Sequence, residues 1–287
     1  MLRQIVKAGM AALVVFVAVG WFRPGTASAE IRLGLLPRLN ATEMTTMFTP
    51  LAEYLSKETG EKVSLVVPKD FDAFKALVSS GQVDMGFANP LVYVQLKKND
   101  ASLDPLGLAS EKSGTKFRGI IIVRKDSGID RVQDLKGRKL IFVEQDSAAA
   151  HIFQMLTLSK AGLDVQKDFT KLPFAKKQTN VALAVFNKAA DAGGIREDDL
   201  EKMKEVVDLA RIKVIAYTDY YPNWPLFSTK KMNKAAAEKV KAALLKLKPN
   251  SPEAQKAAGP AKITGFAPVA DKDYDLLRQA ARVAGAL

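Results

Sequence analysis

Cysteine is missing from all 287 residues, and histidine occurs once. The chain therefore forms no disulfide, and it has no cysteine to carry the lipid anchor of a bacterial lipoprotein. Zinc sites built from His and Cys are excluded for the same reason, as is a Cys–His catalytic pair. We accordingly predict neither a metal nor a cofactor.

Sequence motifs for nucleotide binding and for hydrolysis are missing as well. No Walker loop or G-x-G-x-x-G follows a predicted strand, and no G-x-S-x-G surrounds a serine. Ser147 and His151 stand one helical turn apart, but no orienting acid accompanies them. Because no nucleophile, base and acid can be named together, we predict that the protein is not an enzyme.

The first 29 residues have the pattern of a secretory signal peptide. Arg3 and Lys7 form a short basic region, residues 8–22 carry no charge, and small residues at 26–29 supply a cleavage site. The apolar run is shorter than the roughly 20 residues of a spanning helix, so an uncleaved anchor is the weaker alternative. We predict cleavage before Glu30 and a soluble protein of the periplasm.

Basic residues outnumber acidic ones, 43 to 31, for a formal net charge of +12. Such a surplus raises nucleic acid as a partner. The lysines, however, are spread along predicted helices, as at 234–248, without an aromatic-interleaved basic cluster. We predict no nucleic-acid partner, and we expect the basic surface to favour encounter with small anions.

Short apolar runs alternate with helical patterns from residue 31 onward, which is typical of parallel sheets with crossover helices. A second series of strands and helices begins near residue 117 and extends to about 207. We therefore predict an α/β fold of two lobes, each a mostly parallel sheet flanked by helices. Two crossings, near 118–124 and 213–220, are expected to form a hinge around which the lobes close on a ligand.

Polar residues follow the first and third predicted strands. Arg38 and Asn40 come after the strand at 31–36, and Asn89 and Tyr93 come after the strand at 83–88. Ligands on such sheets bind beyond the carboxyl ends of strands. We predict that these four residues lie on one ligand-binding rim.

The segment Phe142–Phe153 is predicted as a buried strand that runs directly into a helix. Asp146 or Ser147 is the candidate N-cap, and the backbone amides of Ala148 and Ala149 would have no partners within the helix, as an anion site requires. From these residues alone, an ordinary capped helix is an equal alternative. His151, one turn later, is either a packing residue or a ligand contact.

Several segments, in the same order along the chain, resemble the periplasmic phosphate/phosphonate-binding proteins of ABC importers. They are Pro37, Thr49–Leu55, Thr59-Gly60, Gly81–Gly86, Val123–Ile129, Asp134–Gly137, Val181–Ala192 and Gly265–Pro268. The resemblance covers residues 30–287. It implies a Venus-flytrap fold of the type II periplasmic binding protein superfamily, with lobe I at 30–120 plus 217–287 and lobe II at 121–216.

The same resemblance implies a function and partners. The protein is expected to capture a small phosphorus oxyanion (phosphate, phosphite or phosphonate) in the cleft and to present it to an ABC permease of the inner membrane. We expect it to act as a monomer. The alternative is a periplasmic sensing subunit that binds a different small anion and signals through a receptor.

The resemblance also adds site candidates. Gln178 and Asn180 stand where the family often carries a His, and Tyr221 lies in a loop rich in aromatics and proline. Asp191 matches an acidic position common in the family, and a structural turn role for it is equally favoured.

One departure from the family concerns Ser147-Ala148-Ala149-Ala150, where phosphonate-binding members typically carry Ser-Thr-Ser-Gly. Two lost hydroxyl bonds would weaken phosphonate binding by about two orders of magnitude. Arg38, Arg118 and Arg196 are the candidates to compensate with charge-assisted bonds.

Overall fold

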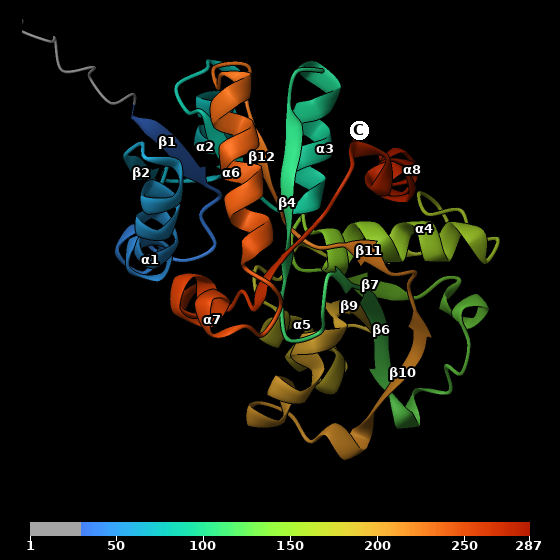
Figure 1. The fold of residues 1–287 in the computed structure, drawn as a ribbon. Coiled ribbons are helices and arrows are strands. Elements are labelled where there is room, and N and C mark those ends of the chain that lie inside the picture. The colour runs from blue at the N-terminus through green and yellow to red at the C-terminus, as the bar shows by residue number, and fades with distance from the viewer. Residues whose placement is uncertain (1–29) are drawn as a thin grey trace, which may run out of the picture.

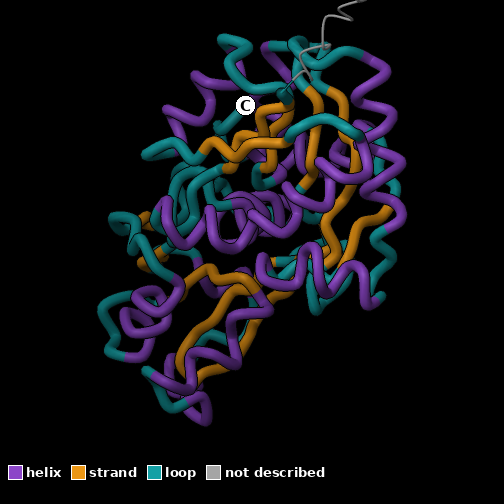
Figure 2. The backbone as a smooth tube through the Cα atoms, turned by 60° about the vertical axis from the view of Figure 1, so that its left-hand side comes forward, coloured by secondary structure: helices purple, strands orange, loops and turns teal. Residues whose placement is uncertain are grey.

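A computed structural model describes residues 30–287, so the predicted signal peptide lies outside the described residues. The strands form two main sheets, each with helices around it, and the chain has two lobes (Figure 1). Figure 2 shows the strands in two separate groups. The predicted two-lobed α/β fold is confirmed. None of the helices in residues 30–287 has the length and apolar character needed to cross a membrane.

The larger sheet has six strands in the order β13-β4-β12-β3-β1-β2. Its strands are β1 (Ile31–Leu35), β2 (Val63–Val66), β3 (Met85–Phe87), β4 (Asp104–Ser110), β12 (Pro225–Ser228) and β13 (Gly265–Ala267). The α-helices of this lobe are α1 (Ala41–Thr59), α2 (Phe71–Ser79), α3 (Pro90–Asn99), α6 (Lys234–Lys246), α7 (Pro252–Ala258) and α8 (Asp275–Val283).

The smaller sheet has five strands in the order β10-β6-β9-β7-β8. Its strands are β6 (Gly119–Arg124), β7 (Lys139–Ile141), β8 (Thr170–Lys171), β9 (Ala192–Arg196) and β10 (Ile212–Tyr217). Its helices are α4 (Phe153–Lys160), α5 (Gln178–Phe186) and a 3₁₀ helix at Glu197–Glu205.

Both sheets are mixed, so the expectation of mostly parallel sheets is wrong. In the larger sheet β1 is parallel to β2 and β3, whereas β12 is antiparallel to β3 and β4, and β13 is antiparallel to β4. In the smaller sheet β6 is antiparallel to both β9 and β10. The antiparallel pairs involve the strands next to the chain crossings, because a strand that returns from the other lobe enters the sheet in the opposite direction.

The chain passes from one sheet to the other twice, between β4 and β6 and again between β10 and β12. A short antiparallel pair, β5 (Lys116–Phe117) with β11 (Tyr221–Pro222), joins the two crossing segments. The returning tail then supplies β12 and β13 to the larger sheet. The larger sheet therefore combines strands from the first part of the chain with strands from its tail.

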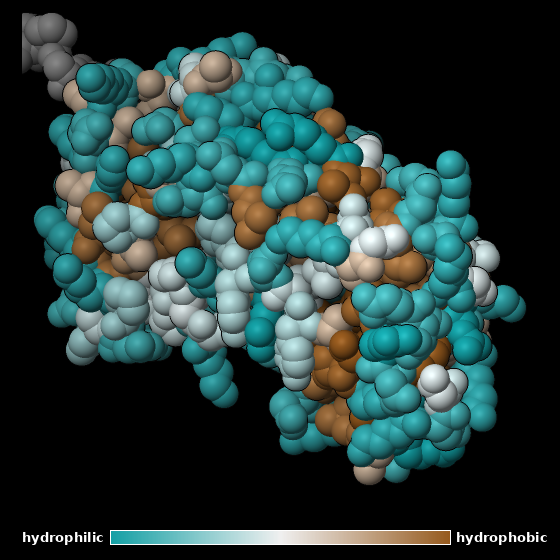
Figure 3. Space-filling model, turned by 90° about the vertical axis from the view of Figure 1, so that its right-hand side faces the viewer, coloured by the Kyte–Doolittle hydropathy of each residue, from teal (hydrophilic) through white to brown (hydrophobic). Residues whose placement is uncertain are grey.

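A hydrophobic cluster spans both lobes at the crossings. Helix α4 packs against α8 (Figure 1), and Phe153 stacks on Tyr221 with ring centroids 3.6 Å apart. Phe117 packs against Phe153 from the first crossing. On the face beside α8 and α4, the two lobes stand as a larger and a smaller body with a mostly hydrophilic surface (Figure 3).

Two local predictions in the second lobe need correction. The segment Phe142–Phe153 was predicted to begin as a buried strand, but strand β7 already ends at Ile141. The helix after it starts with a π-helical turn, Ala148–Ile152, before α4 begins. The second series of strands and helices was expected to end with a helix at 197–207, and the segment forms a 3₁₀ helix, Glu197–Glu205. Short-range hydrophobic periodicity does not distinguish these tighter or wider helices from an α-helix.

Candidate ligand-binding site

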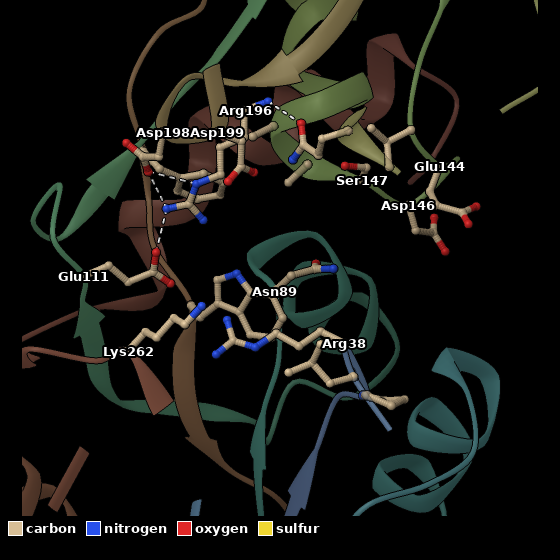
Figure 4. Close-up of a pocket in the computed structure, with 18 of the residues that line it drawn as sticks. Arg38, Asn89, Glu111, Glu144, Asp146, Ser147, Arg196, Asp198, Asp199 and Lys262 are labelled. Carbon is tan, nitrogen blue, oxygen red and sulfur yellow. Dashed lines mark hydrogen bonds and ion pairs between the residues drawn. The ribbon is translucent and has the colours of Figure 1, made fainter. Parts of the chain in front are cut away.

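A cleft of about 720 Å³ opens between the two lobes (Figure 4). Strands β1 and β3 of the larger sheet and β7 and β9 of the smaller sheet end at it, and β12 begins at it. Its lining residues are Pro37, Arg38, Leu39, Met47, Phe71, Asn89, Glu111, Phe117, Val143, Glu144, Asp146, Ser147, Ala148, Ala149, Lys176, Gln178, Arg196, Asp198, Asp199, Lys202, Trp224 and Lys262.

Six of the predicted site residues line this cleft, and both lobes contribute to the set. They are Arg38, Asn89, Ser147, Ala148, Ala149 and Gln178. Five of them were identified because they follow a predicted strand or begin a predicted helix, and Gln178 was identified through the family resemblance. Sequence reasoning therefore brings these residues to one cleft, while their contact with a ligand stays a prediction.

The other six predicted residues do not line the cleft. Two belong to the interior: Tyr93 is fully buried and donates to Asp271 Oδ1 at 2.7 Å, and Tyr221 is fully buried against Phe153. Burial raises the pKa of both phenols, with Asp271 a further cause for Tyr93 and Asp219 for Tyr221. Both tyrosines pack in the hydrophobic cluster that spans the lobes.

The remaining four residues make local hydrogen bonds. Asn40 caps α1 by accepting from the Glu43 amide, and Asp191 accepts from the Lys139 amide at 2.8 Å. Asn180 donates to the Ala175 carbonyl. His151 is 6% exposed, and its Nδ1 lies 2.9 Å from the Gln145 carbonyl oxygen. The structure gives each of these four a structural contact.

The π-helical turn after β7 forms part of the cleft wall. Its first hydrogen bond runs from the Ile152 amide to the Ser147 carbonyl, so the amides at 148–151 have no acceptor within the turn. The Ala149 carbonyl accepts from Gln154 Nε2 at 2.7 Å, and Gln154 is fully buried. The Ala149 carbonyl and the Ala150 N–H belong to one peptide group, and because this group is planar and trans they point in opposite directions. The Ala150 N–H therefore points away from Gln154. The turn thus has donors available for an anion.

Asn89 and Gln178 line the cleft from opposite lobes. Asn89 Oδ1 caps α3 by accepting from the Val92 amide at 2.9 Å, which leaves its Nδ2 group as a donor. Gln178 Oε1 accepts from the Arg196 amide at 2.8 Å, which leaves its Nε2 group. Both side chains therefore combine a fixed position with an amide donor.

Arg38 supplies charge from the first lobe. Its guanidinium donates to the Ala261 carbonyl at 3.0 Å and lies over the Trp224 ring, 5.4 Å from the centroid. The surrounding cleft walls lower the pKa of Arg38 by desolvation; Glu111 raises it, and Arg196 lowers it further. An arginine stays protonated at neutral pH despite such a shift. Within residues 30–287, Arg38 forms no ion pair.

The acidic residues of the cleft, in contrast, are all paired with basic side chains. Glu111 Oε2 lies 2.7 Å from Arg196, and Asp198 Oδ2 lies 2.6 Å from the same guanidinium. These carboxylates raise the pKa of Arg196 above its usual value although burial alone would lower it. The other pairs are Asp146 with Lys75, Glu144 with Lys176 and Asp199 with Lys202.

After this pairing, Arg38 and Lys262 are the two lining charges without an ion pair in the described chain, and both are cationic. Arg196, which the sequence offered as a compensating arginine, is already engaged by two carboxylates. Arg118, the other candidate, lies outside the cleft, where it forms two hydrogen bonds with Glu197. The structure therefore leaves Arg38 as the available arginine of the three.

Sequence reasoning missed several lining residues. Glu111 follows β4 at a tight hairpin, and Lys262 lies in the returning tail, so neither carries a local motif. Trp224 belongs to the aromatic and proline-rich loop at 219–225, and that composition was a signal which the prediction used only for Tyr221. Long-range chain return brings these residues to the cleft.

Comparisons with known proteins agree with this arrangement. A family model described as "ABC transporter, phosphonate, periplasmic substrate-binding protein" matches residues 33–274. The phosphate-import protein PhnD of Mycolicibacterium smegmatis is 25% identical over 304 aligned residues, which cover 97% of this chain and 94% of that protein. The tetrathionate sensor histidine kinase TtrS of Salmonella typhimurium is 24% identical over 81% of this chain but only 42% of its own length.

Among solved structures, the chain is similar to PhnD1 from Prochlorococcus marinus in complex with methylphosphonate. The two share 16% sequence identity with a TM-score of 0.71, over 90% of this chain and 99% of that chain. At this identity the likeness concerns the fold. The likeness agrees with the two-lobed fold described above.

Proposed function

The chain belongs to the family of periplasmic substrate-binding proteins of phosphonate ABC transporters, and we propose that it holds a phosphorus oxyanion between Arg38 and the turn at Ser147. The candidate ligands are phosphate, phosphite and phosphonates. Its family relative from Mycolicibacterium smegmatis is named for phosphate import, and the similar structure from Prochlorococcus marinus contains methylphosphonate. Both names fit a tetrahedral anion in the cleft.

The observation that carries this proposal is the charge pattern of the cleft. All five lining carboxylates are paired, while Arg38 has no ion pair within residues 30–287. An unpaired guanidinium across the cleft from a set of amide donors favours an anion, because charge-assisted hydrogen bonds to oxygens are about twice as strong as neutral ones. Arg38 would thereby replace the hydroxyls that are missing at Ala148 and Ala149.

The two lobes supply different parts of such a site. The amides at Ala148 and Ala149 and the Ser147 hydroxyl would meet the oxyanion from lobe II, proposed at 121–216. Arg38 and Asn89 would meet it from lobe I, proposed at 30–120 plus 217–287. Closure of the lobes around the ligand would then present the complex to the inner-membrane permease. We propose that residues 1–29 are the export signal and that the protein acts as a monomer without turnover of its ligand.

A sensing role is the second candidate, favoured by the likeness to the tetrathionate sensor kinase. That relative is matched over less than half of its length. The family model instead describes a transport component over residues 33–274. Transport is therefore the better supported role.

Calorimetric titration tests the ligand class. The mature protein is titrated with phosphate, phosphite, methylphosphonate, aminoethylphosphonate and a sulfonate of similar size. We expect at least one phosphorus oxyanion to bind with micromolar or tighter affinity and the sulfonate to bind more weakly. No heat from any phosphorus oxyanion, in protein stripped of bound ligand by unfolding and refolding, would contradict the proposal.

A further inference from the structure

The cleft is larger than a simple oxyanion requires. Methylphosphonate has five heavy atoms, which at the volume of a liquid water for each atom fill roughly 150 Å³. The cleft volume is about 720 Å³, within the range of about 300–1,000 Å³ typical of sites for drug-sized molecules. A single tetrahedral group held at Arg38 and the Ser147 turn would leave most of this space to water.

A second cation faces the unfilled part. Lys262 lines the cleft from the returning tail and has no ion pair within residues 30–287. Figure 4 places Lys262 and Arg38 on one side of the cavity and Ser147 on the other. The Arg38 guanidinium is held by the Ala261 carbonyl, the neighbour of Lys262. Arg38 and Lys262 therefore lie on the same wall of the cleft.

The backbone conformation of Lys262 limits which substitutions suit this position. Its φ is +61°, in the left-handed region where glycine and asparagine are favoured over lysine. Lys262 takes this conformation where it ends the short 3₁₀ helix Gly259–Ala261. A variant that removes the charge should therefore keep a residue that accepts a left-handed backbone.

Part of the cleft wall is apolar. Leu39 is 46% exposed although it is a large hydrophobic residue, and it lines the cleft together with Met47 and Trp224. A bare inorganic anion gains nothing from such a surface. An organic spacer would bury against it.

We infer that the ligand carries two anionic groups joined by a short organic spacer: a phosphonyl or phosphoryl group at Arg38 and the Ser147 turn, and a second anion, such as a carboxylate, at Lys262. This inference rests on the proposed function, because it extends the same site. Lys262 is then a specificity-determining residue: it favours ligands with two anionic groups over phosphonates of equal length with one.

The test compares ligands that differ only in the far group. Methylphosphonate, propylphosphonate and 3-phosphonopropionate are titrated into the mature protein; the last two have similar length, and only the last has a second charge. We expect 3-phosphonopropionate to bind roughly 10- to 100-fold more tightly than propylphosphonate, as one added charge-assisted contact provides. Aminoethylphosphonate, whose far end is cationic, should bind more weakly than propylphosphonate.

Three variants assign the effect to Lys262. Lys262→Asn removes the charge but suits the left-handed backbone, and it should abolish the advantage of 3-phosphonopropionate over propylphosphonate. Lys262→Arg should retain it. Lys256→Gln removes an exposed lysine of α7 that does not line the cleft, and it should change neither ligand.

Each other outcome contradicts the inference. Equal affinities for propylphosphonate and 3-phosphonopropionate would show that the far charge is not recognised. If Lys262→Asn lowers the affinity for propylphosphonate and for 3-phosphonopropionate equally, Arg38 and Lys262 both bind the same anionic group. If methylphosphonate binds in either case, the proposed function stands although the inference fails. If no phosphorus ligand binds, both fail.

Discussion

The two walls of the cleft differ in how their charges are used. On the second lobe, Arg196, Lys176 and Lys202 each face one or two carboxylates, so the charges largely cancel, and the open donors are backbone amides. On the first lobe, Arg38 and Lys262 have no such partners in the described chain. The first wall thus supplies charge, and the second supplies a shaped set of hydrogen-bond donors.

This difference explains how the chain could bind an anion without the hydroxyls common in its family. The Ser147 turn keeps the amides but has alanine at the next three positions. Arg38 adds a charge-assisted contact from the opposite wall. Because the two contributions come from different walls, a substitution can weaken one wall and leave the other in place.

The largest effect is expected from Arg38→Met, which removes the free guanidinium and keeps much of the side-chain volume. A charge-assisted contact contributes roughly 1.5–3 kcal/mol, so the affinity for a phosphorus oxyanion should fall about 100-fold. Calorimetry with the tightest-binding oxyanion of the panel measures this loss.

The matched control for Arg38 is Arg138→Met, which removes an exposed arginine that does not line the cleft. It should leave the affinity unchanged. Retention of full affinity by Arg38→Met would mean that the charge of the first wall is not used.

The next effect concerns the backbone of the second wall. A Cβ atom at Gly119 would lie 2.3 Å from Gln154 Nε2 and 2.4 Å from the Ala149 oxygen, so Gly119→Ala pushes on the π-helical turn. Overpacking of this kind costs about 1–3 kcal/mol of unfolding free energy. Urea unfolding should show that loss, with a weaker oxyanion affinity.

Gly259→Ala provides the control for Gly119. A Cβ atom there would meet only the flexible end of Gln255, at 3.2 Å. Unfolding free energy and affinity should both stay close to those of the unsubstituted protein. Equal behaviour of the two glycine variants would contradict the account of the turn.

A smaller effect is expected at the hydroxyl of the second wall. Ser147→Ala removes one donor and keeps every backbone amide, so the affinity should fall about 5- to 10-fold. A loss comparable to that of Arg38→Met would mean that the hydroxyl, rather than the guanidinium, dominates binding. Calorimetry of both variants with the same ligand makes this comparison.

The smallest effect concerns His151, which packs behind the turn between Phe142 and Phe174. Burial lowers the pKa of His151, and the charge of Lys171 lowers it further, whereas the hydrogen bond to the Gln145 carbonyl raises it. The unfolded chain, with a His pKa near 6.5, then binds more protons than the folded one as pH falls below about 6.5. Stability should decrease there, by no more than about 1.4 kcal/mol per pH unit.

Urea unfolding at pH 7, 6 and 5 measures this slope, and His151→Asn serves as the reference because it cannot titrate. The difference in unfolding free energy between the two proteins should change over this range. A constant difference would mean that His151 does not titrate with folding. The carboxylates with lowered pKa, such as Asp134 and Asp168, lose their contribution only at more acid pH.

The part of the site that sequence predicts is the part that follows strands. Arg38, Asn89 and Ser147 each come directly after a β-strand or its short loop, and the carboxyl ends of such strands meet at one edge. Alternation of apolar and helical segments likewise predicts the two lobes and most element positions. Local signals suffice wherever neighbours in sequence are neighbours in the site.

The remaining part depends on contacts that no local pattern encodes. Tyr93 and Tyr221 are near the predicted rim in sequence, but their rings turn into the core that spans the lobes. Lys262 and Glu111 reach the cleft only because the tail returns to the first sheet. Strand direction also escaped prediction, since an apolar run reads the same in a parallel and an antiparallel sheet.

The central claim is that both walls hold one oxyanion, and a crystal structure of the complex with the tightest-binding oxyanion tests it most directly. We predict oxyanion oxygens about 2.7–3.1 Å from the Arg38 guanidinium and from at least one amide at Ala148 or Ala149. An oxyanion bound at Arg196 in place of Glu111, with Arg38 free, would contradict the account.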